Sequence, residues 1–430
     1  MLLGCIADDF TGATDLANNL VRNGMRVVQT IGIPEQSVQR FDNTDAVVVA
    51  LKSRTIDPAD AVSQSLAALE WLQQAGCEQF YFKYCSTFDS TDRGNIGPVT
   101  DALMSALATD FTIACPAFPA TGRTIFRGHL FVNDQLLSDS SMRHHPLTPM
   151  TDSDLVSVLQ RQTRRKVGLL RYDTIAAGAD AVREKIQSLR ADDVEIAVAD
   201  SLHDADLHSL AAGCAELPLL TAGSGVAIGL PANYQRAGKL ASTTGQASMP
   251  DVQGPAVIIS GSCSSATLAQ VHAYAQDHDR YQLDPLRLAK GEAEILAVTQ
   301  EAVTIALTAQ QNGSAALIHA SAEPEAVKAA QDVMGREAAG ALVEQVLATC
   351  ASQLRAQGTR RFVVAGGETS GAVVQALGVD ALRIGPQIDP GVPWTESIGA
   401  EPLALALKSG NFGAVDFFSK ALDLLDNPAS

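Results

Sequence analysis

The feature that most constrains this fold is the alternation of strand-like and helix-like segments along the first half of the chain. Short apolar runs rich in Val, Ile and aromatic residues are expected to form strands at 2–7, 26–32, 45–51, 79–84 and 111–115. Helical patterns separate them, at 13–22, 59–75 and 97–108. Because a parallel strand pair needs a long crossover, usually a helix, this order predicts a largely parallel, doubly wound sheet.

The alternation continues and is then interrupted. Further strands are expected at 167–171, 194–199 and 217–221, whereas 124–150 has no pattern that we can assign. Small, polar, Pro and Gly residues fill 236–255, which is typical of a linker.

A second α/β block follows this linker. Its expected elements are strands at 256–260, 315–319 and 361–365, helices at 264–276 and 323–356, and a strand-rich segment at 380–409. The chain is therefore predicted to form two α/β lobes with mostly parallel sheets, residues 1–235 and residues 256–430. An active site between two such lobes would lie in the inter-domain cleft.

Composition narrows the function. The chain has 430 residues and a net charge of −17, which argues against nucleic acid as a partner. No apolar run approaches the ~20 residues of a membrane span, and the N-terminus has no signal-peptide pattern. The seven cysteines include no C-x-x-C pair, which disfavours a disulfide framework or a zinc site. We expect a cytoplasmic protein that binds small molecules, and a homodimer is compatible with the general preference for two-fold assemblies.

The first candidate site is IADDFTGATD, residues 6–15. Asp8 and Asp9 follow the first expected strand, where open α/β sheets bind ligands. Two adjacent carboxylates at this point suit the removal of a proton from a substrate hydroxyl, or its orientation. Gly12 would allow close approach of a ligand, and Asp9 or Thr11 could cap the following helix. The structural alternative is that both acids only cap that helix.

The second candidate site follows the strand at 79–84. Lys83 comes first, then Asp89, Ser90 and Thr91, and then Arg93. Cations beside hydroxyls and a carboxylate suit a polyhydroxy carboxylic acid, with Lys83 on its carboxylate and Asp89 on its hydroxyls. A solvated loop rich in Ser and Thr is the alternative.

Further cations end neighbouring strands. Arg54 follows the strand at 45–51, and Arg123 follows PAFPATG after the strand at 111–115. Together with Lys83 they form the local positive charge that an anionic substrate would need in an acidic protein.

Three turns in the second lobe combine glycine with hydroxyl residues. They are Ser260 to Ser264, Gly366 to Gly371, and the segment around Gly410. Such turns hold phosphate through backbone N–H groups, although any one of them is also an ordinary helix cap. No Walker A motif or protein-kinase signature is present.

Six ordered blocks together resemble the four-carbon acid sugar kinases. They are IADDFTGATD, FKYCSTFDSTDRGNIGPV, PAFPATGRT, ISGSCS, AGGETSG and LKSGNFG, from residue 6 to residue 413. The resemblance implies an N-terminal sugar-acid domain and a C-terminal nucleotide-binding domain. It also implies transfer of phosphate from ATP to a terminal hydroxyl, within the branch that acts on a four-carbon 3-oxo acid.

The resemblance places Asp8, Asp9, Gly12, Asp89, Ser90 and Thr91 in the family's acid-sugar motifs, and it places Ser260, Gly366 to Thr369 and Gly410 where the family would hold ATP. Thr11, the cations at the strand ends and Ser262 join these sets from the residue patterns described above. Asp8 and Asp9 would be catalytic, and the sugar acid would contact Thr11, Gly12, Arg54, Lys83, Asp89, Ser90, Thr91 and Arg123. ATP would contact Ser260, Ser262, Gly366, Gly367, Glu368, Thr369 and Gly410. Mg²⁺ would bridge the phosphates of ATP, with no metal ligand assigned in the chain.

Other functions remain open at this point. D-threonate or D-erythronate could be the acceptor, since only one carbonyl separates them from the 3-oxo acid. A non-catalytic sensor of sugar acids or nucleotides would leave the paired acids without a purpose. A dehydrogenase would depend on Gly223 to Gly229, whose spacing is one residue too long for a dinucleotide fingerprint.

Overall fold

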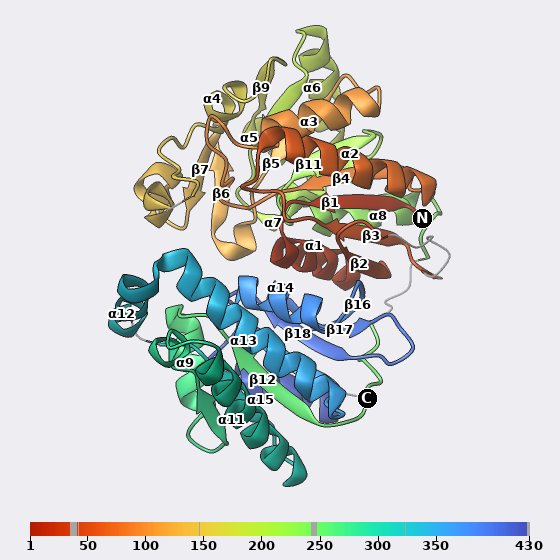
Figure 1. The fold of residues 1–430 in the computed structure, drawn as a ribbon. Coiled ribbons are helices and arrows are strands. Elements are labelled where there is room, and N and C mark those ends of the chain that lie inside the picture. Colours follow the sequence, from red (N-terminus) through yellow and green to blue (C-terminus); the bar gives the residue numbers. More distant parts are fainter. Residues whose placement is uncertain (35–40, 42, 146, 242–246, 323, 428–430) are drawn as a thin grey trace. The chain divides into compact units, whose positions relative to one another are not determined.

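The computed structural model describes residues 1–34, 41, 43–145, 147–241, 247–322 and 324–427 (Figure 1). It divides into two compact units, Met1–Gln246 and Ala247–Ser430. Both are α/β units with mostly parallel sheets, as the sequence predicts. The finer boundaries at 235 and 256 stay predictions, and residues 242–246 of the expected linker lie outside the described part.

The sheet of the first unit is parallel throughout. Its strands, in spatial order, are β2 (Val27–Ile31), β3 (Ala46–Ala50), β1 (Leu3–Ala7), β4 (Gln79–Lys83), β11 (Leu219–Ala222), β5 (Thr112–Cys115), β10 (Ile196–Ala199) and β9 (Val167–Leu170). From β1 the chain runs to β2 and β3, which lie on one side of β1, and then to β4, which lies on the other side. The point where the strand order reverses therefore lies at β1, and open α/β sheets bind their ligands at such a point.

Helices cover both faces of this sheet. They are α1 (Phe10–Arg22), α2 (Pro58–Gln74), α3 (Ile96–Ala106), α4 (Leu155–Gln160), α5 (Tyr172–Ala176), α6 (Ala179–Ala191), α7 (Asp204–Gly213) and α8 (Leu230–Arg236). Figure 1 shows α2 and α3 on one side of β1 and β4, with α1 on the other. Helix α1 begins three residues earlier than the sequence predicts, because Asp9 caps it by accepting a hydrogen bond from the N–H of Gly12.

The segment 124–150, for which the sequence has no assignment, contains most of a small antiparallel sheet. Its strands are β6 (Arg123–Phe126), β7 (His129–Val132) and β8 (Gln135–Leu136). Ile125 exchanges backbone hydrogen bonds with Ser201, which attaches this sheet to the chain beyond β10. Strands this short leave little periodic signal in the sequence.

The sheet of the second unit is parallel except at one edge. Its strands, in spatial order, are β13 (Arg280–Gln282), β14 (Ala316–His319), β12 (Ala256–Ser260), β15 (Arg361–Ala365), β18 (Ala404–Lys408), β17 (Val392–Ser397) and β16 (Ala381–Asp389). Strand β17 is antiparallel to both of its neighbours. The order reverses at β12, since β13 and β14 lie on one side of it and β15 on the other.

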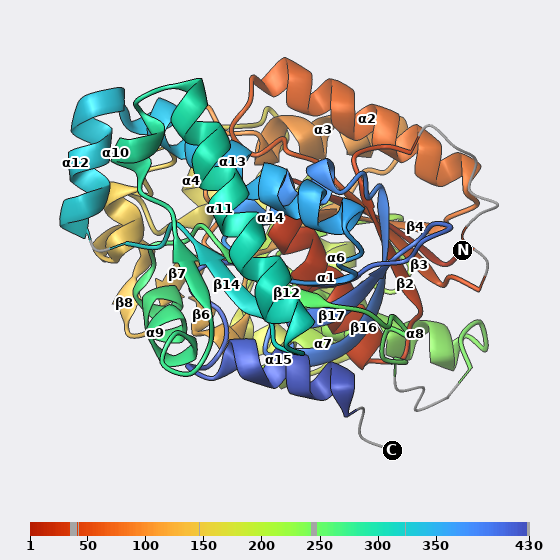
Figure 2. The ribbon, with the colours of Figure 1, turned by 60° about the horizontal axis from the view of Figure 1, so that its bottom comes forward.

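The helices of the second unit are α9 (Ser265–Tyr274), α10 (Pro285–Leu288), α11 (Glu292–Gln311), α12 (Pro324–Met334), α13 (Arg336–Ala356), α14 (Gly367–Ala376) and α15 (Phe417–Asp426). The sequence predicts one helical stretch at 323–356, and the structure divides it between α12 and α13. Gly335 separates them with a φ of 82°, which a right-handed helix cannot contain. Residue 323 lies outside the described residues. Figure 2 shows α11 crossing the unit near β12 and β14.

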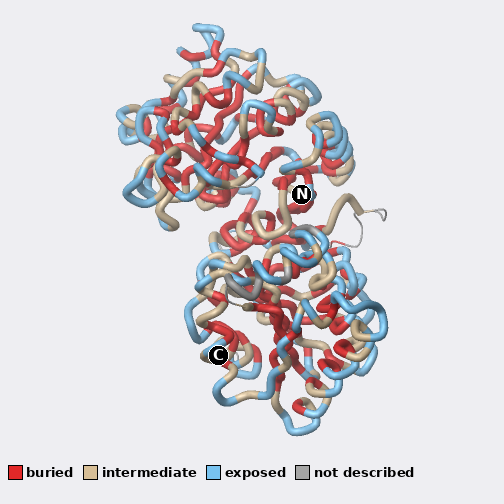
Figure 3. The backbone as a smooth tube through the Cα atoms, turned by 60° about the vertical axis from the view of Figure 1, so that its left-hand side comes forward, coloured by how far each residue is buried: buried red, intermediate tan, exposed pale blue. Residues whose placement is uncertain are grey.

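Both units are built around buried strands, drawn in red in Figure 3. In the second unit Trp394, Phe417 and Phe418 form part of one core cluster, and the indole N–H of Trp394 donates to the carbonyl of Ala421 at 3.0 Å. All seven cysteines are unbridged. None of the helices in the described part of the chain has the length and hydropathy that crossing a membrane requires.

Candidate active site

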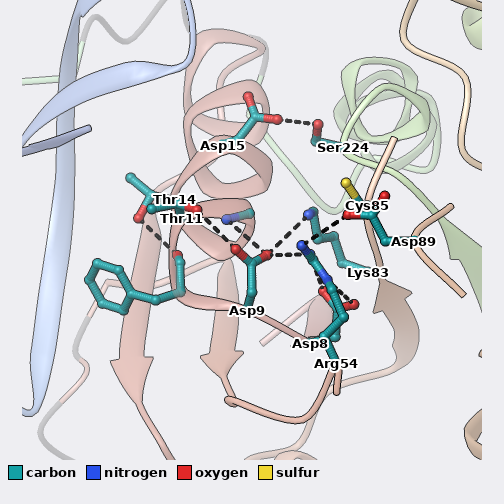
Figure 4. Close-up of polar contacts among 12 residues, drawn as sticks. Asp8, Asp9, Thr11, Thr14, Asp15, Arg54, Lys83, Cys85, Asp89 and Ser224 are labelled. Carbon is teal, nitrogen blue, oxygen red and sulfur yellow. Dashed lines mark hydrogen bonds and ion pairs between the residues drawn. The ribbon is translucent and has the colours of Figure 1, made fainter. Parts of the chain in front are cut away.

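Arg54 joins carboxylates that follow two different strands (Figure 4). Its Nε and Nη2 donate to the two oxygens of Asp8 at 2.8 Å each, and Nη2 also reaches Oδ1 of Asp9 at 2.7 Å. Its Nη1 lies 3.6 Å from Oδ2 of Asp89. The parallel register sets Ala7 beside Ala50 and Lys83, which explains why residues just beyond these strands meet. Arg54 thus binds the protein's own acids, whereas the sequence analysis assigns it to the carboxylate of the substrate.

Lys83 is the second cation of this group, which we call the acid–cation cluster: Asp8, Asp9, Arg54, Lys83 and Asp89. Its Nζ lies 3.7 Å from Oδ1 of Asp9, and the side chain is only 5% exposed. A Cβ on Gly12 would lie 2.0 Å from this Nζ. The glycine therefore lets the lysine rest against the first turn of α1, which is a structural reason for the glycine that the sequence alone does not reveal.

The loop after β4 holds Asp89 in a strained backbone. Phe88 and Asp89 have φ values of 66° and 40°, in the left-handed region that L-residues seldom adopt. The hydroxyl of Thr87 donates to Asp89 at 2.7 Å, while Ser90 donates to Gln162 at 3.0 Å. Strain of this kind concentrates at functional sites. Ser90 thus fastens the loop, and Thr91 lies half-buried beyond it.

Electrostatics fix the ionisation of Asp9. Burial would raise the pKa of its carboxyl, but the charges of Arg54 and Lys83 and the hydrogen bonds from Thr11 and Gly12 outweigh burial and hold the pKa well below its usual range. A carboxylate with so low a pKa is a weak proton acceptor. Its side chain is 27% exposed, against 7% for Asp8, so a ligand could reach it.

Two residues of this region are absent from the sequence-based assignment. Asp15, on the same helix as Gly12, accepts a hydrogen bond from the hydroxyl of Ser224, and burial raises the pKa of its carboxyl. Asn95 donates from Nδ2 to the carbonyls of Ser53, Arg54 and Ile56, which fixes the loop that carries the arginine. These contacts join distant parts of the chain, so local sequence patterns do not signal them.

Arg123 has a different environment. Its Nη1 donates to the carbonyl of Thr121 in its own loop. Its buried Nε has no hydrogen-bond partner among the described residues, which leaves a donor that a ligand could satisfy.

The glycine segment that could have favoured a dehydrogenase is a structural turn. Gly223 and Gly225 pack against the chain after β5, where added Cβ atoms would lie 2.7 Å and 2.3 Å from the carbonyl oxygens of Pro116 and Ala117. The glycines therefore serve close backbone packing.

In the second unit, the three glycine turns follow adjacent strands. The register sets Ser260 beside Ala365, and Ala365 beside Lys408. The turns after β12, β15 and β18 therefore begin at one edge of the sheet. They carry Ser260, Ser262, Gly366, Gly367, Glu368, Thr369 and Gly410, all of which the sequence analysis assigns to ATP.

The carbonyl of Gly410 is the centre of this group. It accepts hydrogen bonds from Ser264 Oγ at 2.6 Å, Thr267 Oγ1 at 2.7 Å and Lys408 Nζ at 3.2 Å. A Cβ on Gly410 would lie 2.3 Å from the hydroxyl of Ser262. Lys408, which the sequence analysis does not assign, is fully buried, and burial lowers its pKa to about 8.

Thr369 of α14 packs against the glycine turns that follow β12 and β15. A Cβ added to Gly261 would lie 2.2 Å from the Thr369 hydroxyl, and one added to Gly366 would lie 2.9 Å from it. Gly366 also has a φ of 124°, which favours glycine. The glycine turns therefore lead directly into the N-termini of α9 and α14, and helix N-termini are suited to binding phosphate.

Among the described residues, no group of three or more His, Cys, Asp or Glu side chains is arranged to hold a metal ion. Mg²⁺ commonly keeps most of its waters and is held by substrate phosphates.

Comparison with known proteins defines the class of this chain. The model of the sugar-binding N-terminal domain matches residues 3–230, and that of the nucleotide-binding C-terminal domain matches residues 257–418. The chain therefore belongs to the family that joins these two domains.

Named relatives are closely similar. A 3-oxo-tetronate kinase of Cupriavidus necator is 62% identical, covering 98% of this chain and 96% of the relative. A 3-oxo-tetronate kinase of Burkholderia multivorans is also 62% identical, covering 100% of this chain and 98% of the relative. Among solved structures, Haemophilus influenzae protein HI1011 is 43% identical with a TM-score of 0.83, covering 98% of this chain and 100% of that chain.

The contact between Gly12 and Lys83 predicts the effect of Gly12→Ala. The new methyl group should push Lys83 away from Asp9, and a displacement of this size should lower kcat/KM by about 10²-fold. Steady-state kinetics measure the loss. Gly340→Ala is the matched control, because nothing lies within 4 Å of its added Cβ and only helix propensity should change. Unaltered kinetics in Gly12→Ala would contradict the proposed packing.

Asn95→Ala should release the loop that carries Arg54. Three carbonyls would lose their shared donor, which should cost about 1–3 kcal/mol in the free energy of unfolding. Because the mobile arginine would no longer hold the two acids, turnover should fall as well. Chemical denaturation and kinetics measure the two effects, and full activity would show that the loop does not depend on Asn95.

The lowered pKa of Lys408 predicts a pH effect. Above about pH 8 this lysine should lose its proton in the folded chain, which weakens the attraction of the turn for phosphate and raises KM for ATP. The unfolded chain keeps the proton up to about 10.5, so the free energy of unfolding should rise between these values. Lys408→Arg should abolish the rise in KM because a guanidinium stays charged. A wild-type KM that stays flat across this range would contradict the prediction.

Proposed function

We propose that this protein is an ATP-dependent kinase that phosphorylates the C4 hydroxyl of 3-oxo-tetronate, giving 3-oxo-tetronate 4-phosphate. The observation that carries the proposal is 62% identity, over nearly the full chain, to relatives named 3-oxo-tetronate kinase. The acid–cation cluster in one unit and the glycine turns in the other supply an acceptor site and a donor site for that reaction.

On the acceptor side, we assign the hydroxyls of the sugar acid to the exposed oxygens of Asp9 and to Asp89. Lys83 and Arg123 are the cations we assign to its carboxylate, since Arg54 is occupied by Asp8 and Asp9. The cations and carboxylates of this cluster can recognise an acid that also carries hydroxyl groups.

Asp9 acts in this proposal by orienting the attacking hydroxyl. Its low pKa makes it a weak base, and phosphoryl transfer depends mainly on positioning and on neutralisation of charge. Asp8 supports it through the shared guanidinium of Arg54. In the alternative assignment, Asp8 removes the proton from the hydroxyl.

On the donor side, the turns after β12, β15 and β18 fit the phosphates of ATP through their backbone N–H groups. Mg²⁺, when bound with ATP, would neutralise the charge that develops on the transferred group. Lys408 and the hydroxyls of Ser264 and Thr267 hold the Gly410 turn in place. For transfer to occur, the sugar acid and the phosphates of ATP must be bound at the same time.

The direct test is release of ADP from Mg-ATP with a panel of four-carbon acids. The panel contains D-threonate, D-erythronate, L-threonate and their enzymatically generated 3-oxo derivatives. Turnover confined to the 3-oxo acids is expected. Turnover of the unoxidised acids would instead favour a D-threonate or D-erythronate kinase, and ligand binding without any turnover would favour a sensor.

The double substitution Asp8→Asn with Asp9→Asn should lower kcat by about 10²–10⁴-fold, roughly 3–5 kcal/mol of transition-state stabilisation. Asp110→Asn is the matched control, because Asp110 forms an exposed ion pair with Arg190, and such pairs contribute little. An unchanged kcat in the double variant would remove both acids from the mechanism.

A cytoplasmic location and a homodimer remain predictions from the sequence. Light scattering of the purified full chain measures the second, and a monomeric mass would exclude it.

A further inference from the structure

A cavity of about 340 Å³ lies in the second unit, between α9 and the sheet edge formed by β13 and β14. One wall is lined by Leu268 and Val271 of α9 and by its C-cap, Ala275. Gln282, His319 and Ser321 line the other, at and just after the ends of the strands. His272 of α9 and Arg280 of β13 also line the cavity, so apolar side chains lie beside several polar groups. A cavity of this size with such a mixed lining is suited to a small molecule.

This cavity adjoins the first glycine turn. Ser321 Oγ lies 2.8 Å from Oγ of Ser260, and the register sets Ser260 beside His319. Neighbouring strands are about 4.8 Å apart, so the cavity begins roughly one strand spacing from the turn assigned to phosphate. The turns after β15 and β18 continue the same edge in the opposite direction.

His319 has a defined hydrogen-bonding character. Its Nδ1 lies 3.3 Å from the carbonyl of Ser321, and a carbonyl only accepts, so Nδ1 carries the hydrogen. Burial lowers the pKa of this imidazole to about 4, with smaller contributions from Arg280 and His272, so the ring is neutral at physiological pH. Its Nε2 is therefore an acceptor on a side chain that lines the cavity.

We propose that this cavity binds the purine base of the nucleotide and selects adenine over guanine, an inference that rests on the proposed ATP site. Leu268, Val271 and Ala275 would pack against the base. The Nε2 of His319 can accept a hydrogen bond from the 6-amino group of adenine. The 6-oxo group of guanine is itself an acceptor, so it would repel Nε2 instead of bonding to it.

The test compares ATP with inorganic tripolyphosphate, which has phosphates but no base. Isothermal titration uses the full chain with Mg²⁺ and without sugar acid. Ala275→Phe should fill the cavity. The affinity for ATP should then fall by about tenfold or more, whereas the affinity for tripolyphosphate should not change. Gln276→Phe is the control, because Gln276 is exposed and does not line the cavity. Unchanged ATP affinity in Ala275→Phe would overturn the proposal.

A second variant decides the case in which Ala275→Phe loses both ligands. His319→Leu places an apolar side chain at the buried position and removes the Nε2 acceptor. The preference for ATP over GTP should therefore fall by about tenfold. An unchanged preference would overturn the assignment. Base selectivity in a chain that phosphorylates no acid would leave the cavity assignment intact and remove the kinase proposal. If the wild-type chain phosphorylates the acid but neither cavity variant changes nucleotide binding, the kinase proposal stands and the cavity assignment fails.

Discussion

The arrangement of the first site depends on one guanidinium group with several carboxylate neighbours. Arg54 binds Asp8 and Asp9 directly and lies near Asp89, so residues that follow β1, β3 and β4 are held at one edge of the sheet. Without that charge the adjacent carboxylates would repel one another in a partly desolvated site. With it, Asp9 stays ionised and remains accessible to a ligand. The same ion pairs that stabilise this edge would therefore also hold it ready for the hydroxylated acid of the proposed function.

The second unit uses the same topology with different chemistry. The edge that we assign to ATP also lies where the strand order reverses, at β12. Here the organising atom is neutral: the carbonyl of Gly410 gathers two hydroxyls and the ammonium group of Lys408. Glycines at this edge keep the backbone accessible, which suits a polyanion such as the phosphates of ATP. In the proposed function, one unit would hold the acid with charged side chains, and the other would hold phosphate with backbone groups.

Sequence patterns were sufficient for most of the architecture, and they placed Asp8 and Asp9 at the end of a strand, where the structure has them. The strand β1, the turn with Asp8 and Asp9, and the glycine turns follow from local periodicity and from the rule that ligands bind at strand ends. Contacts between distant segments were not accessible in this way. The pairing of Asp15 with Ser224 spans 209 residues, and the burial of Lys408 depends on the packing of the whole unit. The role of Arg54 as a partner of Asp8 and Asp9 likewise requires the sheet register.

The most direct test of the account is the position of the phosphate on the product, read by proton-coupled ³¹P NMR after incubation with Mg-ATP and the 3-oxo acid. Transfer to the C4 oxygen places the phosphorus next to a methylene group, so the account predicts a triplet. A doublet would indicate transfer to the C2 hydroxyl, which has a single neighbouring proton, and an uncoupled signal would indicate an acyl phosphate. Either of these would contradict the proposed orientation of the acid in the cluster around Arg54.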